Sequence, residues 1–171
     1  MLKLFNNLSV KIKIGLAVVL PLLALIGYAG NVVMDRNTTA NDMSKIEFVA
    51  KRAPMISNFV HSLQQERGLS AGAINSGGAA RFVSAVTAQR SSSDQFGEQA
   101  RAALAEIAEE NLAPSLTALV QEATSALGAL ASNRSQVDGR SICAPEMAAF
   151  YGNLIAKLTL VIQDISLLST N

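Results

Sequence analysis

Several residue types that build catalytic or metal sites are scarce in this sequence of 171 residues. It has no tryptophan, six phenylalanines, two tyrosines, one histidine and one cysteine. The lone cysteine, Cys143, excludes an intramolecular disulfide and a zinc site built from several cysteines. The lone histidine, His61, has no second histidine or cysteine at the spacing of metal ligands. We therefore expect no metal site.

An excess of charge of one sign is also missing. Fourteen lysines and arginines face thirteen aspartates and glutamates, for a net charge of +1. Without a basic surface, nucleic acid is not an expected partner. Gly77 and Gly78 lack the Lys-Ser/Thr pair that follows a phosphate-binding loop. No nucleophile stands in a pattern with a general base, so we predict no enzymatic activity, no catalytic residue and no cofactor.

The composition is typical of an all-α protein. Half of the residues are apolar, few are aromatic, and β-branched residues concentrate near the N-terminus. Apolar stripes at helical spacing, divided by Gly and Pro, predict an antiparallel (up-down) bundle. The expected helices run from about 39–42 to 75, from about 79 to 110, from 115 to 134 and from about 145 to the end of the chain.

A long apolar run precedes these helices. Residues 14–34 carry no charged side chain and as a helix would span about 30 Å, the thickness of a membrane core. Lysines before the run place the N-terminus in the cytoplasm. We expect a cytoplasmic N-terminus (1–13), a transmembrane helix (14–34) and a periplasmic helical domain (35–171) on a single-pass protein of the inner membrane. A cleaved signal peptide is the alternative, because Gly27-Tyr28-Ala29 resembles a cleavage site.

One helix carries a cation on its predicted packing face. Apolar residues recur at helical spacing from Ile56 to Leu63, and the next position of the series is Arg67. A buried guanidinium is costly unless an anion or a hydrogen-bond acceptor meets it. Gly68 and Gly72 flank this position, although glycine inside a helix costs about 1 kcal/mol relative to alanine. Such glycines are tolerable where another backbone or a ligand comes close.

The next helix has a polar break in its apolar stripe, at Gln89 and Ser93 with Arg90 at the edge. If the two helices form a hairpin, Gln89 and Arg90 lie at a height similar to that of Arg67. Two interpretations of Arg67 remain open. It pairs with a carboxylate on a neighbouring helix or reaches solvent at the bundle edge, or it binds a small anion together with Gly68, Gln89 and Arg90.

These residues resemble a known family, the NIT domains that sense nitrate and nitrite in bacterial signalling proteins. The resemblance is carried by Leu63-Gln-Gln-Glu-Arg-Gly-Leu-Ser-Ala-Gly72, Asn75-Ser-Gly-Gly78 and Gln89-Arg90-x-x-x-Asp94, and it extends from about residue 50 to the end of the chain through Phe82, Leu130 to Arg134 and Tyr151-x-x-Leu-Ile155. It implies an all-helical sensor that binds nitrate or nitrite between helices, with Arg67 as the ligand arginine.

The resemblance also implies a setting for the domain. The family has a second ligand arginine in a second half of the domain, so residues 35–171 are expected to be a truncated first half. A span followed by such a domain is similar to the N-terminal part of a methyl-accepting chemotaxis protein, a receptor that works as a homodimer and signals through its membrane helix. The alternatives are a structural or partner-binding bundle without a small ligand, and a truncated, non-functional remnant.

Overall fold

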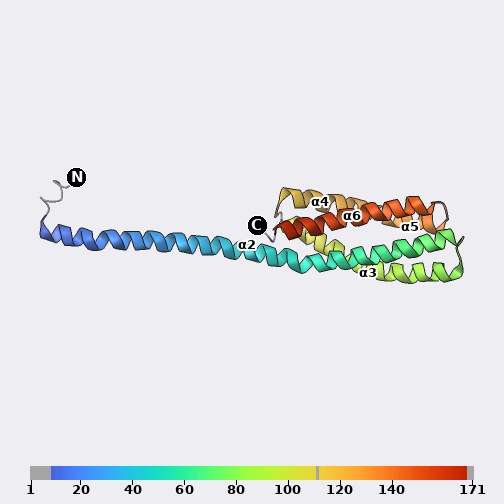
Figure 1. Ribbon diagram of the computed structural model, residues 1–171, viewed down its shortest axis with the longest axis horizontal. Helices are drawn as coiled ribbons and strands as arrows, with labels where there is room; N and C mark the ends of the chain where they lie inside the picture. The colour runs from blue at the N-terminus through green and yellow to red at the C-terminus, as the bar shows by residue number, and fades with distance from the viewer. Residues whose placement is uncertain (1–8, 111, 169–171) are drawn as a thin grey trace. The chain divides into compact units, whose positions relative to one another are not determined.

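The computed structural model describes residues 9–110 and 112–168. It divides into two units, residues 1–44 and residues 45–171, which we describe separately. Within the described residues every regular element is an α-helix, which confirms the all-α prediction. Figure 1 labels them α2 (Val10–Asn75), α3 (Ala80–Glu110), α4 (Pro114–Gly128), α5 (Leu130–Asp138) and α6 (Ala144–Leu168).

The predicted membrane span concerns the first unit. We expected residues 14–34 to cross the inner membrane once. Among the residues that the structure describes, no helix combines the length and the apolar character needed for such a crossing. This finding contradicts the predicted single-pass localisation, and with it the placement of the remaining chain in the periplasm.

The helix that was expected to begin at about residues 39–42 starts earlier in the structure. Residues 39–42 lie inside α2 instead of beginning a new helix. Thr, Asn and Asp are less favourable than alanine inside a helix by only about 0.7 kcal/mol or less, so their preference for caps does not by itself interrupt a helix. Pro54 likewise lies inside α2 without ending it.

The turn between α2 and α3 falls where the sequence predicts it. Gly77 and Gly78 have φ angles of 64° and 84°, a region that glycine adopts at little cost. The amide of Gly78 donates to the carbonyl oxygen of Ala73 at 2.9 Å, which closes the end of α2. The Ser76 hydroxyl accepts from the amide of Ala79 at 3.2 Å and so caps the start of α3.

The third predicted helix, 115–134, is two helices in the structure. α4 starts at Pro114, a residue suited to the first turn of a helix, and ends at Gly128. The amide of Ala129 donates to the carbonyl oxygen of Ala126, three residues back, and α5 then runs to Asp138.

The helical segments of residues 45–168 pack around one hydrophobic core, as in a helical bundle. In Figure 1, α4, α5 and α6 run beside α3 and the second half of α2. The antiparallel up-down order stays a prediction. The largest fully buried side chains of the core are Ile56, Phe59, Leu63, Leu104, Ile107, Leu116, Leu127, Met147, Tyr151, Leu154 and Leu158.

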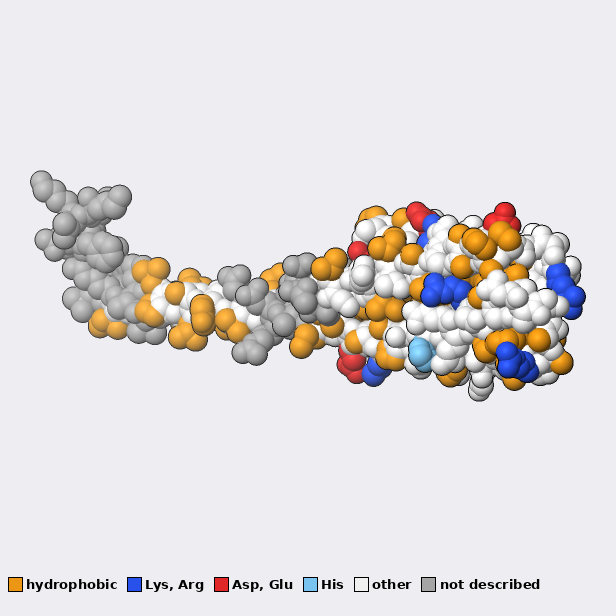
Figure 2. All heavy atoms as spheres, turned by 45° about the vertical axis from the view of Figure 1, so that its right-hand side comes forward, with side chains coloured by type: hydrophobic (Ala, Val, Ile, Leu, Met, Phe, Trp, Pro, Cys, Tyr) orange, Lys and Arg blue, Asp and Glu red, His pale blue; other side chains and the backbone are white. Residues whose placement is uncertain are grey.

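The polar residues divide into a scattered surface set and a small buried set. On the face shown in Figure 2, the charged side chains of the second unit are dispersed among apolar and uncharged ones. The buried polar side chains are Ser62, Glu66, Ser70, Ser93 and Asn133. Glu66 is the charged member of this set and is 0% exposed, a placement that requires partners.

Candidate functional site: a buried ionic cluster beside Arg67

Glu66 is held by side chains from three other helices. Arg134 of α5 donates from Nε to Oε1 at 2.7 Å and from Nη2 to Oε2 at 2.8 Å. The hydroxyl of Tyr151, on α6, donates to Oε1 at 2.8 Å. Arg90 of α3 forms an ion pair with the same oxygen, with Nε at 3.4 Å. The carboxylate therefore joins α2, α3, α5 and α6 at one point.

Both arginines also bind a carboxylate at the surface. Arg134 Nη1 donates to Asp94 Oδ1 at 2.5 Å. Arg90 Nη1 donates to the two carboxylate oxygens of Asp138, each at 2.8 Å. Each guanidinium is only 15% exposed, and the two aspartates are 61% exposed. The cluster of Glu66, Arg90, Asp94, Arg134 and Asp138, which we call the ionic cluster, thus extends from the core to solvent.

Two groups at this site, Arg134 and Tyr151, have raised pKa values. Burial lowers the pKa of Arg134, but hydrogen bonds to Glu66 and Asp94 outweigh this effect and raise the pKa above its ordinary value. Burial, together with the charge of Glu66, raises the pKa of Tyr151. A tyrosine that donates to a buried carboxylate resists ionisation because its own negative charge would lie beside that of Glu66.

A second polar contact joins α2 and α3 one turn before Glu66. The hydroxyls of Ser62 and Ser93, both buried, lie 3.0 Å apart. Gln89 Nε2 donates to Ser62 Oγ at 2.9 Å and to the Ser62 carbonyl oxygen at 3.2 Å. Gln89 and Arg90 therefore face α2 beside Ser62 and Glu66, at the height predicted from a hairpin. The polar break in the stripe of α3 serves this contact with α2.

Arg67 lies next to the centre of the buried face and not at it. Glu66 is fully buried, whereas Arg67 is half-buried. The ion pair predicted for Arg67 with a carboxylate on a neighbouring helix is not among the described contacts. The buried ion pair at this face of α2 joins Glu66 and Arg134. Within the described part of the chain, Arg67 has no hydrogen bond or ion pair, including with Gln89 or Arg90. The structure therefore brings Arg67 to the edge of the ionic cluster without joining it.

The two glycines that flank Arg67 have different surroundings. A Cβ atom added to Gly72 would lie 2.6 Å from a ring carbon of Phe82, so this glycine admits the ring from α3. A Cβ atom added to Gly68 would meet no atom within 4 Å. Gly72 therefore allows a close approach of another helix. This is one of the two explanations expected for these glycines, the other being a ligand. Packing gives no reason for Gly68, which is exposed beside Arg67.

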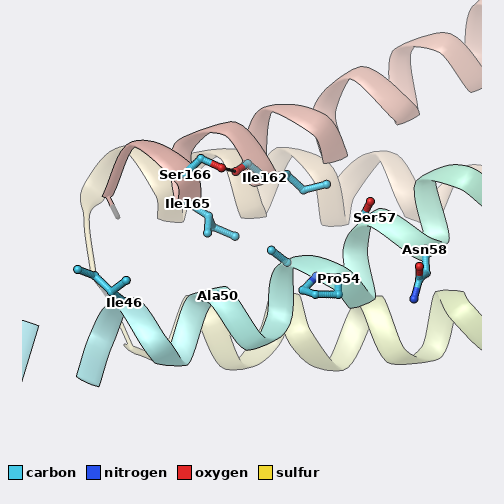
Figure 3. Close-up of a pocket in the computed structure, with 9 residues that line it drawn as sticks. Ile46, Ala50, Pro54, Ser57, Asn58, Ile162, Ile165 and Ser166 are labelled. Carbon is cyan, nitrogen blue, oxygen red and sulfur yellow. Dashed lines mark hydrogen bonds between the residues drawn. The ribbon is translucent and has the colours of Figure 1, made fainter. Parts of the chain in front are cut away.

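The pocket of Figure 3 lies elsewhere and has another character. It is a groove of about 490 Å³ between α2 and α6. Ile46 and Ala50 of α2 and Ile162 and Ile165 of α6 are among its lining residues, and no charged side chain contributes to the lining. Such a lining does not suit a small anion, which needs a cation or several hydrogen-bond donors.

Glu66, Arg134 and Tyr151 were not predicted as a unit from the sequence. Each was part of a segment that carried the family resemblance, but their pairing joins residues 68 and 85 positions apart. One signal was available. Tyr151 lies in the apolar stripe of α6, and a buried tyrosine hydroxyl requires a hydrogen-bond partner on another element.

Comparisons with known proteins agree with the resemblance found in the sequence. Residues 58–171 match the model of the NIT family, described as nitrate and nitrite sensing. The solved structure titled "Structure of the NasR transcription antiterminator" is similar over 83% of this chain and 38% of that chain, with a TM-score of 0.71 and 25% sequence identity. No curated protein matches the chain.

These matches indicate a sensing role and not catalysis, and they give no support to a chemotaxis receptor, a periplasmic domain or a homodimer. The NasR chain extends well beyond the part that this chain covers. Since the family model matches more than half of the chain, the chain belongs to the NIT family of nitrate- and nitrite-sensing domains.

Proposed function

We propose that this chain is a sensor domain that binds nitrate, nitrite or a similar small oxyanion between its helices, with Arg67 as the primary contact. The observation that carries the proposal is the state of this guanidinium. Arg90 and Arg134 each bind two carboxylates, whereas Arg67 is half-buried with no partner among the described residues. A planar guanidinium offers paired N–H donors that match the oxygens of a planar oxyanion.

Gly68 supports the same location. It lies inside α2, where glycine is less favourable than alanine by about 1 kcal/mol, and no protein atom occupies the space beside it. We propose that an anion bound to Arg67 uses this space and approaches the backbone there. Of the four predicted ligand residues, Arg67 and Gly68 are then the direct contacts. Gln89 and Arg90 act by holding α3 against α2.

The proposed signal is a shift between two arrangements of α2 and α3. An anion bound to Arg67 stabilises the arrangement that provides more hydrogen-bond donors to the anion. The equilibrium shifts because the anion binds that arrangement more tightly than the other. The polar contacts between Ser62, Ser93 and Gln89 lie at the interface that would change. A homodimer remains part of this proposal, and light scattering with and without nitrate tests it.

Isothermal titration calorimetry of the full chain tests the proposed ligand class. We expect saturable binding of nitrate and of nitrite with one site per chain. Chloride should bind more weakly, because a single spherical ion cannot place a separate acceptor atom opposite each of two parallel N–H donors. If nitrate, nitrite and chloride all give only heats of dilution, the proposal is wrong, and a structural or partner-binding bundle or a non-functional remnant is the better account.

A further inference from the structure

Three arginines lie at or beside Glu66 in the described part of the chain, and two of them form ion pairs with it. Arg90 and Arg134 both form ion pairs with the Glu66 carboxylate, which is 0% exposed. Arg67 follows Glu66 directly in the chain and makes no such contact within the described residues. Glu66, Asp94 and Asp138 thus compensate the charges of two of the three guanidinium groups.

This compensation determines where a further anion can bind. A nitrate ion approaching Arg134 would meet Glu66 on one side of the guanidinium and Asp94 on the other, at 2.7 Å and 2.5 Å from its nitrogens. Like charges at such separations repel strongly, most of all where little water screens them. Arg90 is shielded in the same way by Glu66 and Asp138. Arg67 is the guanidinium of the three that an added anion reaches without displacing a carboxylate.

The same carboxylate also fixes the rotation of α2 about its axis. Successive side chains on a helix project about 100° apart, so the direction of Glu66 sets that of Arg67. Glu66 is held toward α5 and α6 by Arg134 and Tyr151, through both of its oxygens. Arg67 is therefore directed to the flank of the helix, beside the open space at Gly68.

We propose that Glu66 is a positioning residue of the anion site: it pairs with Arg90 and Arg134 inside the bundle and orients α2, so that Arg67 is the arginine available to a small oxyanion. This inference rests on the proposed function of Arg67. Stability alone does not account for a buried ion pair, because replacing such a pair with apolar side chains of similar volume is often neutral or stabilising. The role of Glu66 is then to determine which of the three guanidinium groups is available to an anion.

Binding of nitrate to a double variant tests the orienting role. Glu66→Gln combined with Arg134→Met removes both charges of the Glu66–Arg134 pair together. Arg90 keeps its ion pair with Asp138, so the domain is expected to fold. Calorimetry should show nitrate affinity reduced at least tenfold, with helix content by circular dichroism unchanged. Arg52→Met with Glu106→Gln is the matched control, since it removes an ion pair between α2 and α3 that is more exposed, and nitrate affinity should stay the same. A folded Glu66/Arg134 variant with wild-type affinity would overturn the inference.

A second readout needs no nitrate. Phenylglyoxal modifies accessible arginines, and peptide mass spectrometry of the native protein measures the rate at each position. We expect Arg67 to react at least fivefold faster than Arg90 and Arg134, with exposed Arg81 as the reference. Equal rates at Arg67, Arg90 and Arg134 would overturn the inference whether or not nitrate binds. If Arg67 reacts faster as expected but the chain binds no nitrate, the proposed function is wrong. The inference that Glu66 leaves Arg67 as the accessible arginine would still hold.

Discussion

Arg134 and Glu66 form a forked pair, with Nε donating to Oε1 at 2.7 Å and Nη2 donating to Oε2 at 2.8 Å. The pair joins α5 to the C-terminal part of α2 and lies where the family resemblance led us to expect an anion-binding arginine. Its carboxylate comes from the residue directly before Arg67. The ionic cluster and the proposed anion site are therefore neighbours on one helix, but they are separate sites.

The first prediction concerns the energetics of this pair. Glu66→Gln alone should destabilise the domain by about 3 kcal/mol, because it leaves buried guanidinium charge without compensation. Arg134→Met alone should destabilise the domain by a similar amount, because it leaves the buried carboxylate of Glu66 without its main partner. The double variant should be less destabilised than either single variant, which urea unfolding measures through the free energy of unfolding. Additive effects of the two substitutions would show that the residues do not interact in solution.

The second prediction concerns the pH dependence of stability. The pKa of Tyr151 is raised in the folded protein by burial and by Glu66. An unfolded tyrosine ionises near pH 10, so above that pH ionisation favours the unfolded chain and stability falls. The variant Tyr151→Phe should be less stable than wild type at pH 7, by about 1.5–3 kcal/mol for a hydrogen bond to a charged group.

The same variant gives the contrast that isolates Tyr151 from other groups that titrate at high pH. Between pH 9 and pH 11, wild type should lose more stability than Tyr151→Phe, so the difference between them narrows as pH rises. Thermal unfolding at a series of pH values measures this difference. A constant difference over this range would mean that the pKa of Tyr151 is not raised by folding.

The third prediction separates the two glycines beside Arg67. Gly68→Ala should stabilise the free protein by up to about 1 kcal/mol, because the added methyl group meets no atom and alanine favours the helix. Gly72→Ala should be destabilising by about 1 kcal/mol or more, because the ring of Phe82 would have to move. Urea unfolding compares the two. The reverse order of stability would contradict the assigned surroundings of these glycines.

Gly68→Ala has a further expected effect on binding. If an oxyanion approaches the backbone at Gly68, the methyl group that stabilises the free protein should weaken nitrate binding several-fold. Stability and affinity would then change in opposite directions in one variant. Nitrate calorimetry on Gly68→Ala measures this, and unchanged affinity would place the anion away from Gly68.

Much of the helical fold follows from local sequence, and the exceptions have physical reasons. Gly77 and Gly78 end α2 through their φ angles, and Pro114 starts α4, so these boundaries are visible in the sequence. The interruption at Ala129 has no such residue and results from a tightened hydrogen bond. The caps at 39–42 indicated a helix start that the structure lacks, because a cap residue is also tolerated inside a helix.

The site was predicted less completely, because its centre depends on contacts between distant residues. The apolar series through Val60 points to Arg67 as the buried position, whereas the series through Phe59 points to Glu66. The structure follows the second, with Phe59 1% exposed and Glu66 fully buried. A shift of one residue in the assumed helical periodicity thus changes the predicted buried side chain from the cation Arg67 to the anion Glu66. The partners of Glu66, Arg134 and Tyr151, come from helices whose placement a periodic pattern does not give.

The central claim is that Arg67 binds the anion, and nitrate calorimetry on wild type, Arg67→Ala and Arg67→Lys tests it most directly. Arg67 has no partner within the described residues, so Arg67→Ala should leave the free energy of unfolding within about 0.5 kcal/mol of wild type. It should abolish nitrate binding, and Arg67→Lys should weaken it because one ammonium replaces a planar fork of donors. Arg81→Ala, at an exposed arginine of α3, should bind nitrate as wild type does. Nitrate binding to a folded Arg67→Ala variant with wild-type affinity would contradict the account.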